Sequence, residues 1–374
     1  MMLPNGWKKV KLGDILTAVD YGTAAKSDAI GKYPVLRMGN LENGYLVWDD
    51  LVYSSSEDEY AKYELEKGDI LFNRTNSRDK VGKTSIYRGE RPSIFAGYLI
   101  RLKVNNECDP YYVNYCMNSK RFAEFCKSVR TDAIGQSNIN AQVLQTYDFS
   151  LPPLEEQKKI AATLSVWDSA IEKMEKLIEA KESGHAVLMN EMLKNSKTWD
   201  CTCLSDIATI KKGKQLNAVD MISDGAYYVM NGGIAPSGNT DDWNTAENTI
   251  SISEGGNSCG FVAFNKEKFW AGGHCYTLID LNENISVRFL FHYLKNMEKE
   301  IMAMRVGSGL PNIQKDSISD IKVFYPSKKG QERISGVLDD SLSEIALLKQ
   351  QLENYKKQKQ GLMQKLLTGQ WRVK

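Results

Sequence analysis

A polar, basic segment between two strand-like stretches contains side chains well suited to contacts with a nucleic acid. Arginine can bind guanine through two parallel hydrogen bonds, asparagine can do the same with adenine, and lysine binds phosphates well. A solvated surface turn would have a similar composition, so the pattern alone supports both interpretations. The candidate residues of this segment are Arg74, Thr75, Asn76, Ser77, Arg78 and Lys80.

Other polar loops supply further candidates of the same kind. In the first half of the chain these are Gln136, Ser137 and Asn138. In the second half, the densest basic cluster lies at residues 211–214, and several asparagines and one serine occupy corresponding loops. The candidates there are Lys211, Lys212, Lys214, Asn231, Asn257, Ser258 and Asn312.

Patterns typical of catalysis or metal binding are weak in this sequence. Residues 81–84 (VGKT) resemble the end of a phosphate-binding loop, but Ser77 stands where that motif requires its first glycine. The cysteines at 201, 203, 259 and 275 have no zinc-site spacing, and the chain has only three histidines. We therefore expect no catalytic residue, no metal site and no cofactor bound by this chain.

The sequence is an internal duplication. Asn138 and Asn312 stand 174 positions apart, and the same offset pairs Pro152 with Pro326 and Gln157 with Gln331. A match with an offset of 192 opens the two halves, where Trp7 recurs as Trp199. The ends of the two copies are therefore similar, while their interiors differ in length and sequence. A repeated frame with two different interiors could recognise two different targets held at a fixed distance from each other.

The end of each copy predicts a long coiled-coil helix. Apolar residues recur there with alternating spacings of four and three, and prolines precede both segments. Lys181, His185 and Lys359 interrupt the seam at matching positions, where a polar residue could fix the register or simply extend out of the seam into solvent. Seam residues of the first helix are Ile160, Leu164, Trp167, Ile171 and Ile178, and those of the second are Ile334, Leu338, Ile345, Leu348 and Leu352.

The remaining segments read as short strands, turns and helices, so the expected fold is mixed α/β (α+β). Two such domains would be joined by two long antiparallel coiled-coil helices with approximate two-fold symmetry. The expected boundaries are residues 1–150 for the first domain, 151–195 for the first long helix, 196–329 for the second domain and 330–374 for the second long helix.

Composition and charge leave the choice of partner open. The net charge of +1 is compatible with DNA binding but does not argue for it. We expect no signal peptide and no membrane span, because no basic start is followed by an apolar stretch and no apolar run is long enough. The seven scattered cysteines indicate reduced thiols and a cytoplasmic protein.

Several motifs resemble the specificity subunits of type I restriction–modification systems. Residues 151–161 (LPPLEEQKKIA), followed by the heptad helix, resemble the first conserved region of that family, and residues 361–369 (GLMQKLLTG) resemble the end of the second. The opening around Trp7 and the strand at residues 68–71 (GDIL) are similar to its target-recognition domains. The sequence departs from the family pattern at residues 328–331 (KKGQ), where a Leu-Glu-Glu-Gln segment is typical.

The resemblance implies a non-catalytic subunit that reads a split, asymmetric site in double-stranded DNA. Two methyltransferase subunits would bind the long helices and methylate adenine using S-adenosylmethionine, and restriction subunits using ATP and Mg²⁺ could join them. This chain has no Asp/Asn-Pro-Pro-Tyr methylation motif, since residues 151–154 read LPPL. The alternative is a duplicated coiled-coil adaptor that binds protein and has no preference for any DNA sequence.

Overall fold

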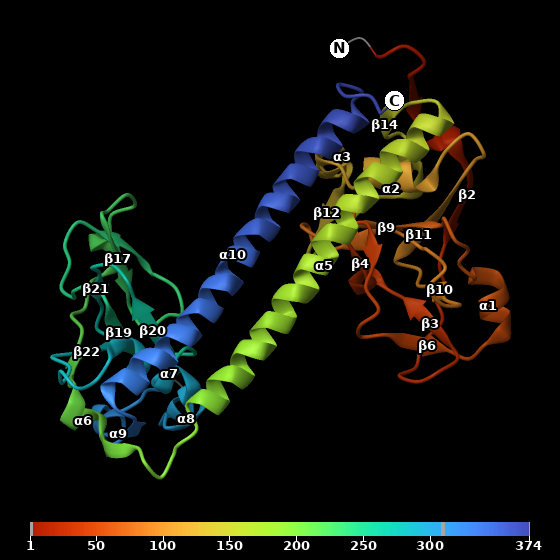
Figure 1. Ribbon diagram of the computed structural model, residues 1–374. Helices are drawn as coiled ribbons and strands as arrows, with labels where there is room; N and C mark the ends of the chain where they lie inside the picture. Colours follow the sequence, from red (N-terminus) through yellow and green to blue (C-terminus); the bar gives the residue numbers. More distant parts are fainter. Residues whose placement is uncertain (1–2, 308–310, 374) are drawn as a thin grey trace. The chain divides into compact units, whose positions relative to one another are not determined.

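The computed structural model describes residues 3–307 and 311–373, which form two compact units. The first unit contains the chain up to Met174 together with the residues from Gln351 onward, and the second contains Glu175–Gln350. Both units mix helices and sheets (Figure 1). The predicted α+β class and the internal repeat are confirmed.

The first unit is built around a four-stranded antiparallel sheet, in which residues near 20 and near 100 pair along their length. A three-stranded sheet with one parallel pair is formed by strands that alternate along the chain with those of the four-stranded sheet. In sheet order, the strands are β2 (Leu16–Tyr21), β11 (Leu99–Val104), β7 (Ile70–Asn73) and β9 (Thr84–Ile86); then β10 (Ile94–Phe95), β3 (Tyr33–Leu36) and β6 (Val52–Ser54); then β12 (Thr131–Ala133), β13 (Gln136–Asn138) and β8 (Thr75–Asn76); and the pairs β1 (Lys8–Lys11) with β14 (Asp148–Leu151) and β4 (Leu41–Glu42) with β5 (Tyr45–Leu46).

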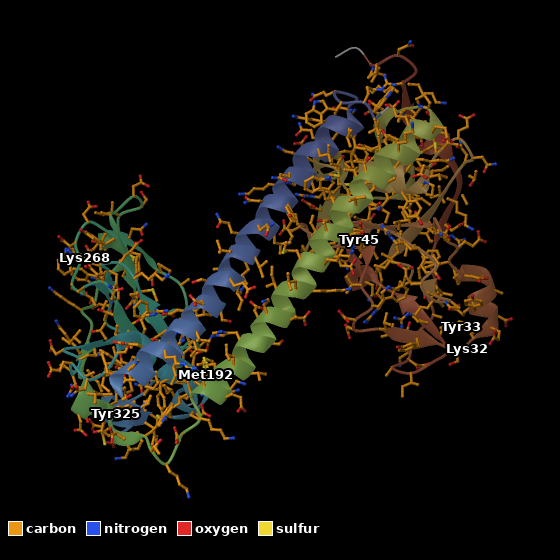
Figure 2. All side chains as sticks on the ribbon, in the orientation of Figure 1. Lys32, Tyr33, Tyr45, Met192, Lys268 and Tyr325 are labelled. Carbon is orange, nitrogen blue, oxygen red and sulfur yellow. The ribbon has the colours of Figure 1, made fainter. Side chains whose placement is uncertain are left out.

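Short capped helices cover the sheets of this unit. Asp109 and Ser119 accept hydrogen bonds at the starts of two of them, which satisfies backbone donors that a helix leaves free. Figure 2 labels Lys32, directly before β3, and Tyr33, at its start. Both side chains bind Glu57 of a third helix. The helices are α1 (Glu57–Tyr63), α2 (Pro110–Met117), α3 (Lys120–Val129) and α4 (Ala141–Leu144), with short 3-10 turns at Leu12–Ile15 and Met38–Asn40.

The second unit repeats this plan with different lengths. Its four-stranded sheet has the same antiparallel order, and its three-stranded sheet also contains one parallel pair. In sheet order, the strands are β16 (Thr209–Lys212), β22 (Cys275–Ile279), β19 (Thr249–Ser253) and β20 (Val262–Asn265); then β18 (Gly238–Thr240), β17 (Tyr227–Met230) and β21 (Trp270–Ala271); and the pair β15 (Asp200–Cys203) with β23 (Lys322–Tyr325). The helices are α6 (Leu204–Ile207), α7 (Val287–Asn296), α8 (Glu298–Ala303) and α9 (Lys315–Ser319), with a 3-10 turn at Ala218–Asp220.

Two long helices, α5 (Leu154–Met192) and α10 (Lys328–Leu367), contribute to both units. Their segments run antiparallel within each unit (Figure 1). In the second unit, Lys181 pairs with Glu344 at 2.6 Å and Glu182 with Lys349 at 2.6 Å. The predicted seam residues are all buried or half-buried. Ile160, Leu164, Ile178, Leu338, Ile345 and Leu352 are buried, while Trp167, Ile171, Ile334 and Leu348 are half-buried.

The polar seam residues behave differently from one another. Lys359 does not extend into solvent, because it forms an ion pair with Asp168 and the two side chains are only 19% and 9% exposed. Tyr115 of α2 donates a hydrogen bond to the same carboxylate at 2.5 Å. The interpretation that Lys359 only reaches out of the seam is therefore wrong. His185 lies 3.1 Å from the Ser341 hydroxyl, and the Lys181 side chain is 41% exposed.

A buried glutamine holds each long helix to its unit. The Gln157 side-chain oxygen accepts the backbone N–H of Asp109 at 2.8 Å, and its nitrogen donates to the carbonyls of Glu107 and Pro152 at 3.0 and 2.9 Å. In the second unit, Gln331 makes the same three bonds. Its oxygen accepts from Ser286 N at 2.8 Å, and its nitrogen donates to the carbonyls of Asn284 and Pro326, both at 3.0 Å. The side chain therefore connects the start of a long helix to the N-terminal cap of α2 or α7.

The end of the chain closes the first unit. Arg372 donates two hydrogen bonds to the carboxylate of Glu156, at 2.5 and 2.8 Å, and Trp7 donates a third at 3.1 Å. Glu156 is buried, so these donors supply the hydrogen bonds that water would otherwise make. Within the described residues, no helix has the length and apolarity needed to cross a membrane.

Candidate nucleic-acid interface

In the first unit, the two predicted groups of polar residues lie on one small sheet. β8 pairs with β13, so that Asn76 lies opposite Ser137 and Thr75 opposite Asn138. The Asn138 amide also donates to the Thr75 hydroxyl at 2.7 Å. The structure therefore brings together side chains that are about sixty positions apart in the sequence.

Arg74 occupies the position directly after β7. Its backbone N–H binds the carbonyl of Tyr98 at 3.1 Å, and its carbonyl accepts from Ile139 at 2.9 Å. The guanidinium carbon lies 4.8 Å from the centre of the Tyr21 ring, which fixes the side chain by a cation–π contact. Its Nε is buried and has no hydrogen-bond partner in the described part of the chain. Arg74 is thus positioned by an aromatic ring and keeps donor capacity for a ligand.

Arg78 has a different environment. Its Nε and Nη2 donate to the Asp132 carboxylate at 2.9 and 2.7 Å, and Arg130 and Ser137 bind the other oxygen of that carboxylate at 3.1 and 2.6 Å. The hydrogen bonds from Ser137 and Arg78 lower the pKa of Asp132, so this carboxylate is ionised at neutral pH. Arg78 therefore anchors the β12–β13 hairpin. Ser77 and Lys80 are exposed in the turn beside it, and Gln136 is exposed on β13.

The second unit has a glutamate at the position that corresponds to Arg74. Glu254 follows β19, its N–H binds the carbonyl of His274 at 2.9 Å, and its carbonyl accepts from Ile313 at 2.8 Å. Lys212 pairs with the Glu254 carboxylate at 2.5 Å, and Tyr276 donates to it at 3.0 Å. Burial and this hydrogen bond raise the pKa of Tyr276 to about 12. Sequence reasoning missed Glu254, because it follows an apolar strand and its partner Lys212 lies 42 residues away.

Other predicted residues of the second unit surround Glu254. The Asn231 side chain accepts the N–H of His274 at 3.3 Å, and Asn312 pairs with Gly255 and Val306 through isolated β-bridges. Asn257 and Ser258 lie in the loop after Gly256, which binds the carbonyl of Pro311. The predicted lysine cluster does not share one face, because Lys211 and Lys212 are consecutive in a strand and point to opposite faces. Lys214 is exposed just beyond β16.

The residues considered for phosphate or zinc binding have ordinary roles in the structure. Gly82 lies in the turn between β8 and β9, with a φ of +94°, and Thr84 begins a strand where the phosphate-loop motif would need a helix. All seven cysteines are free thiols, and those at 259 and 275 are buried. Across residues 3–307 and 311–373, no group of three or more His, Cys, Asp or Glu side chains is arranged to hold a metal ion.

Comparison with known proteins identifies the class. Residues 4–182 and 196–356 each match the family described as type I restriction modification DNA specificity domain. The chain belongs to this family and contains two copies of the domain. It is the non-catalytic specificity subunit of a type I restriction–modification system, as the sequence motifs predict, and the adaptor alternative is not supported.

Relatives of similar length and solved structures of similar fold are also found. The whole chain is 27% identical to the putative type I restriction enzyme MjaX specificity subunit of Methanocaldococcus jannaschii, over 95% of that protein. The crystal structure of the type I restriction–modification S subunit from M. genitalium has a TM-score of 0.68 at 20% identity, covering 98% of both chains. A chain from a structure concerned with complex assembly and conformational transition of the type I system has a TM-score of 0.62 at 15% identity, covering 99% of this chain and 100% of that one. These structural likenesses show the fold.

The different environments of Arg74 and Arg78 lead to different expected effects of substitution. Arg74→Ala should weaken binding to the cognate duplex by about 1–3 kcal/mol and reduce its preference over a scrambled duplex, if the guanidinium reads a base. Arg78→Ala should change this preference less, because Arg78 is engaged by Asp132. Equilibrium binding of the full chain to both duplexes, at two salt concentrations, measures the effect.

Arg88→Ala is the matched control for Arg74→Ala. Arg88 also stacks on a tyrosine, with its guanidinium carbon 4.6 Å from the Tyr45 ring centre, and its Nε is also buried. It lies outside the predicted interface, so this variant should keep wild-type preference. Equal loss in the Arg74 and Arg88 variants would mean that Arg74 acts only through folding.

Proposed function

We propose that this subunit reads a split, asymmetric site in double-stranded DNA, with one half-site recognised by each unit. In this proposal, two methyltransferase subunits bind the long helices and methylate adenine in the site, and restriction subunits join them to cut unmodified DNA. S-adenosylmethionine, ATP and Mg²⁺ would be cofactors of those partners, whereas this chain binds none.

The observation that carries this proposal is the charge difference at one repeated backbone position. Arg74 and Glu254 make equivalent backbone hydrogen bonds. The N–H of each binds the residue just before the neighbouring strand, Tyr98 or His274, and the carbonyl of each accepts from Ile139 or Ile313. Arg74 keeps donors that suit the two acceptors of guanine, whereas the Glu254 carboxylate is engaged by Lys212 and Tyr276, so the two positions offer a base different groups. Two similar frames with opposite charges at the same place favour two different half-sites, and hence an asymmetric target.

The exposed faces of the long helices support partner binding. Val166 in the first unit is 68% exposed, and Val187 and Leu347 in the second are 64% and 65% exposed. A partner that covers these helix faces would remove the apolar side chains from water, which favours the bound state. We infer that these residues contribute to the binding of the methyltransferase subunits.

Exchange of one recognition domain tests this function. Replacing residues 1–151 with the corresponding segment of another specificity subunit should change one half of the methylated motif and leave the other half unchanged. The exchange must include residue 151, because Lys8 of β1 pairs with Leu151 of β14, and separating them would break that sheet. Sequencing of methylated adenines in host DNA identifies the motif.

The reciprocal exchange is the control. Replacing residues 199–326 keeps β15 and β23 together, since Asp200 pairs with Tyr325, and should change only the other half-site. A change in both half-sites after either exchange would contradict independent reading by the two units.

A further inference from the structure

We propose that the β12–β13 hairpin enters the DNA major groove and that Ile134, at its tip, contacts the 5-methyl group of a thymine. This inference rests on the proposed function and identifies a specificity-determining residue for the half-site read by the first unit. The sequence motifs for DNA contacts did not include Ile134, because they were composed of polar side chains.

The position of Ile134 is unusual for an apolar residue. It occupies a two-residue turn with Gly135, and its relative exposure is 107%, so the entire side chain is in solvent. Gly135 has a φ of +78°, and a Cβ built on it would meet no atom within 4 Å. The tip of the hairpin thus projects freely. Covering this side chain on binding would remove apolar surface from water, which favours the bound state.

The base of the hairpin is held firmly. Asp132 lies on β12, where it binds Arg78 from the turn after β8, Arg130 from its own strand end and Ser137 from β13. Arg130 also donates to the carbonyl of Arg78 at 3.3 Å. These bonds fix the hairpin before any ligand binds, so little conformational entropy is lost when the tip inserts.

The dimensions and neighbours of the hairpin fit the major groove. That groove is about 12 Å wide and admits a two-stranded ribbon, whereas the minor groove is about half as wide. The strands beside the tip are Thr131–Ala133 and Gln136–Asn138, and the charge of Asp132 on the first of them is balanced by Arg78 and Arg130. Asn76 lies on the adjacent strand and Gln136 on the hairpin itself, and their amides can bind adenine edges. An apolar side chain among such groups has one specific partner in this groove, the methyl group of thymine.

The proposal concerns the first unit alone. In the first unit, Asn138 pairs with both Thr75 and Thr131. In the second unit, Asn312 pairs in the same way with Gly255 and Val306. The chain between Val306 and Asn312 lies partly outside the described residues, so no contact is inferred there.

Removal of single methyl groups from the DNA tests this contact. Once the methylated motif is known from sequencing, duplexes are made in which deoxyuridine replaces each thymine of the first half-site in turn. The full chain should bind one of these duplexes about three- to tenfold more weakly than the parent, which is the effect expected for one or two buried carbon groups. Ile134→Ala should bind the parent duplex with a similar loss and should be insensitive to the same replacement.

The control variant is Ile30→Ala, which removes another exposed isoleucine of the first unit, 87% exposed, and should keep the wild-type sensitivity to deoxyuridine. If no deoxyuridine duplex weakens wild-type binding, or if Ile134→Ala remains as sensitive as the wild type, the contact is disproved. Wild-type preference for the parent over a scrambled duplex is measured in parallel. Its persistence in that case would show that the proposed function survives, whereas its absence would remove both proposals.

Discussion

Replacing Gln331 with leucine is expected to lower the free energy of unfolding of the second unit by about 3 kcal/mol, because three partly buried backbone groups lose their partner and each loss costs about 1 kcal/mol, the lower end of the range for buried groups. These groups are the N–H of Ser286 and the carbonyls of Asn284 and Pro326. Leucine has a similar volume, so the loss would come from unsatisfied hydrogen bonds and not from a cavity. Because Ser286 caps α7, that helix should open first.

Hydrogen exchange of the full chain, measured peptide by peptide, reports the two units separately. Gln331→Leu should accelerate exchange in α7 and leave α2 protected, and Gln157→Leu should do the reverse. Gln351→Leu is the control, since Gln351 is exposed and its side chain contacts only Tyr355 on the same helix in the described structure, so the expected change is below about 0.5 kcal/mol. Wild-type protection of α7 in Gln331→Leu would show that the glutamine does not hold the helices together.

A matched lengthening of both long helices is expected to change the spacing of the two half-sites. Seven residues keep the heptad seam in phase and add about 10 Å of helix, at about 1.5 Å per residue. One base pair rises about 3.4 Å, so the preferred gap should lengthen by up to about three base pairs. The structure gives the insertion points, between Met174 and Glu175 in α5 and between Gln350 and Gln351 in α10, where the two units divide. Insertion near residue 182 would instead separate Lys181 and Glu182 from their partners Glu344 and Lys349.

The methylated motif of the doubly extended variant, compared with that of the parent, measures the gap. A variant extended in α5 alone is the control, because its seam cannot stay matched and it should lose specific methylation. An active, doubly extended variant that methylates the parental motif with its original gap would contradict a role for the helices in spacing.

Local patterns in the sequence predicted the long helices and the repeat, because heptads and duplicated motifs are visible without knowledge of the fold. Ile160 and Leu338 are buried as the spacing requires. The role of the repeated glutamines was not predictable, since their partners are backbone groups contributed by distant segments. The ion pair of Asp168 was not predictable from the sequence either. This residue lies beside the seam, and only the antiparallel pairing brings Lys359 to it.

In the candidate interface, too, contacts between distant segments were not predictable from the sequence. The polar composition of residues 73–80 and 136–138 was visible, but the pairing of β8 with β13 depends on contacts between remote parts of the chain. The composition also could not distinguish Arg74, which stacks on Tyr21, from Arg78, which is neutralised by Asp132. Ile134 was overlooked for a different reason. An apolar residue in a polar loop is expected to be buried, and only the structure shows that it is not.

The ion pair between Glu156 and Arg372 has a consequence for the order of events during synthesis. The second unit is one continuous stretch of chain, whereas the first needs the residues from Gln351 onward, which are translated after the whole of the second unit. Before those residues are translated, Glu156 cannot bind Arg372 and Asp168 cannot bind Lys359. The apolar surface that packs against the end of α10 is then also uncovered. The unit that is translated first is therefore completed last, and a chain that stops early keeps a finished second unit beside an unfinished first one.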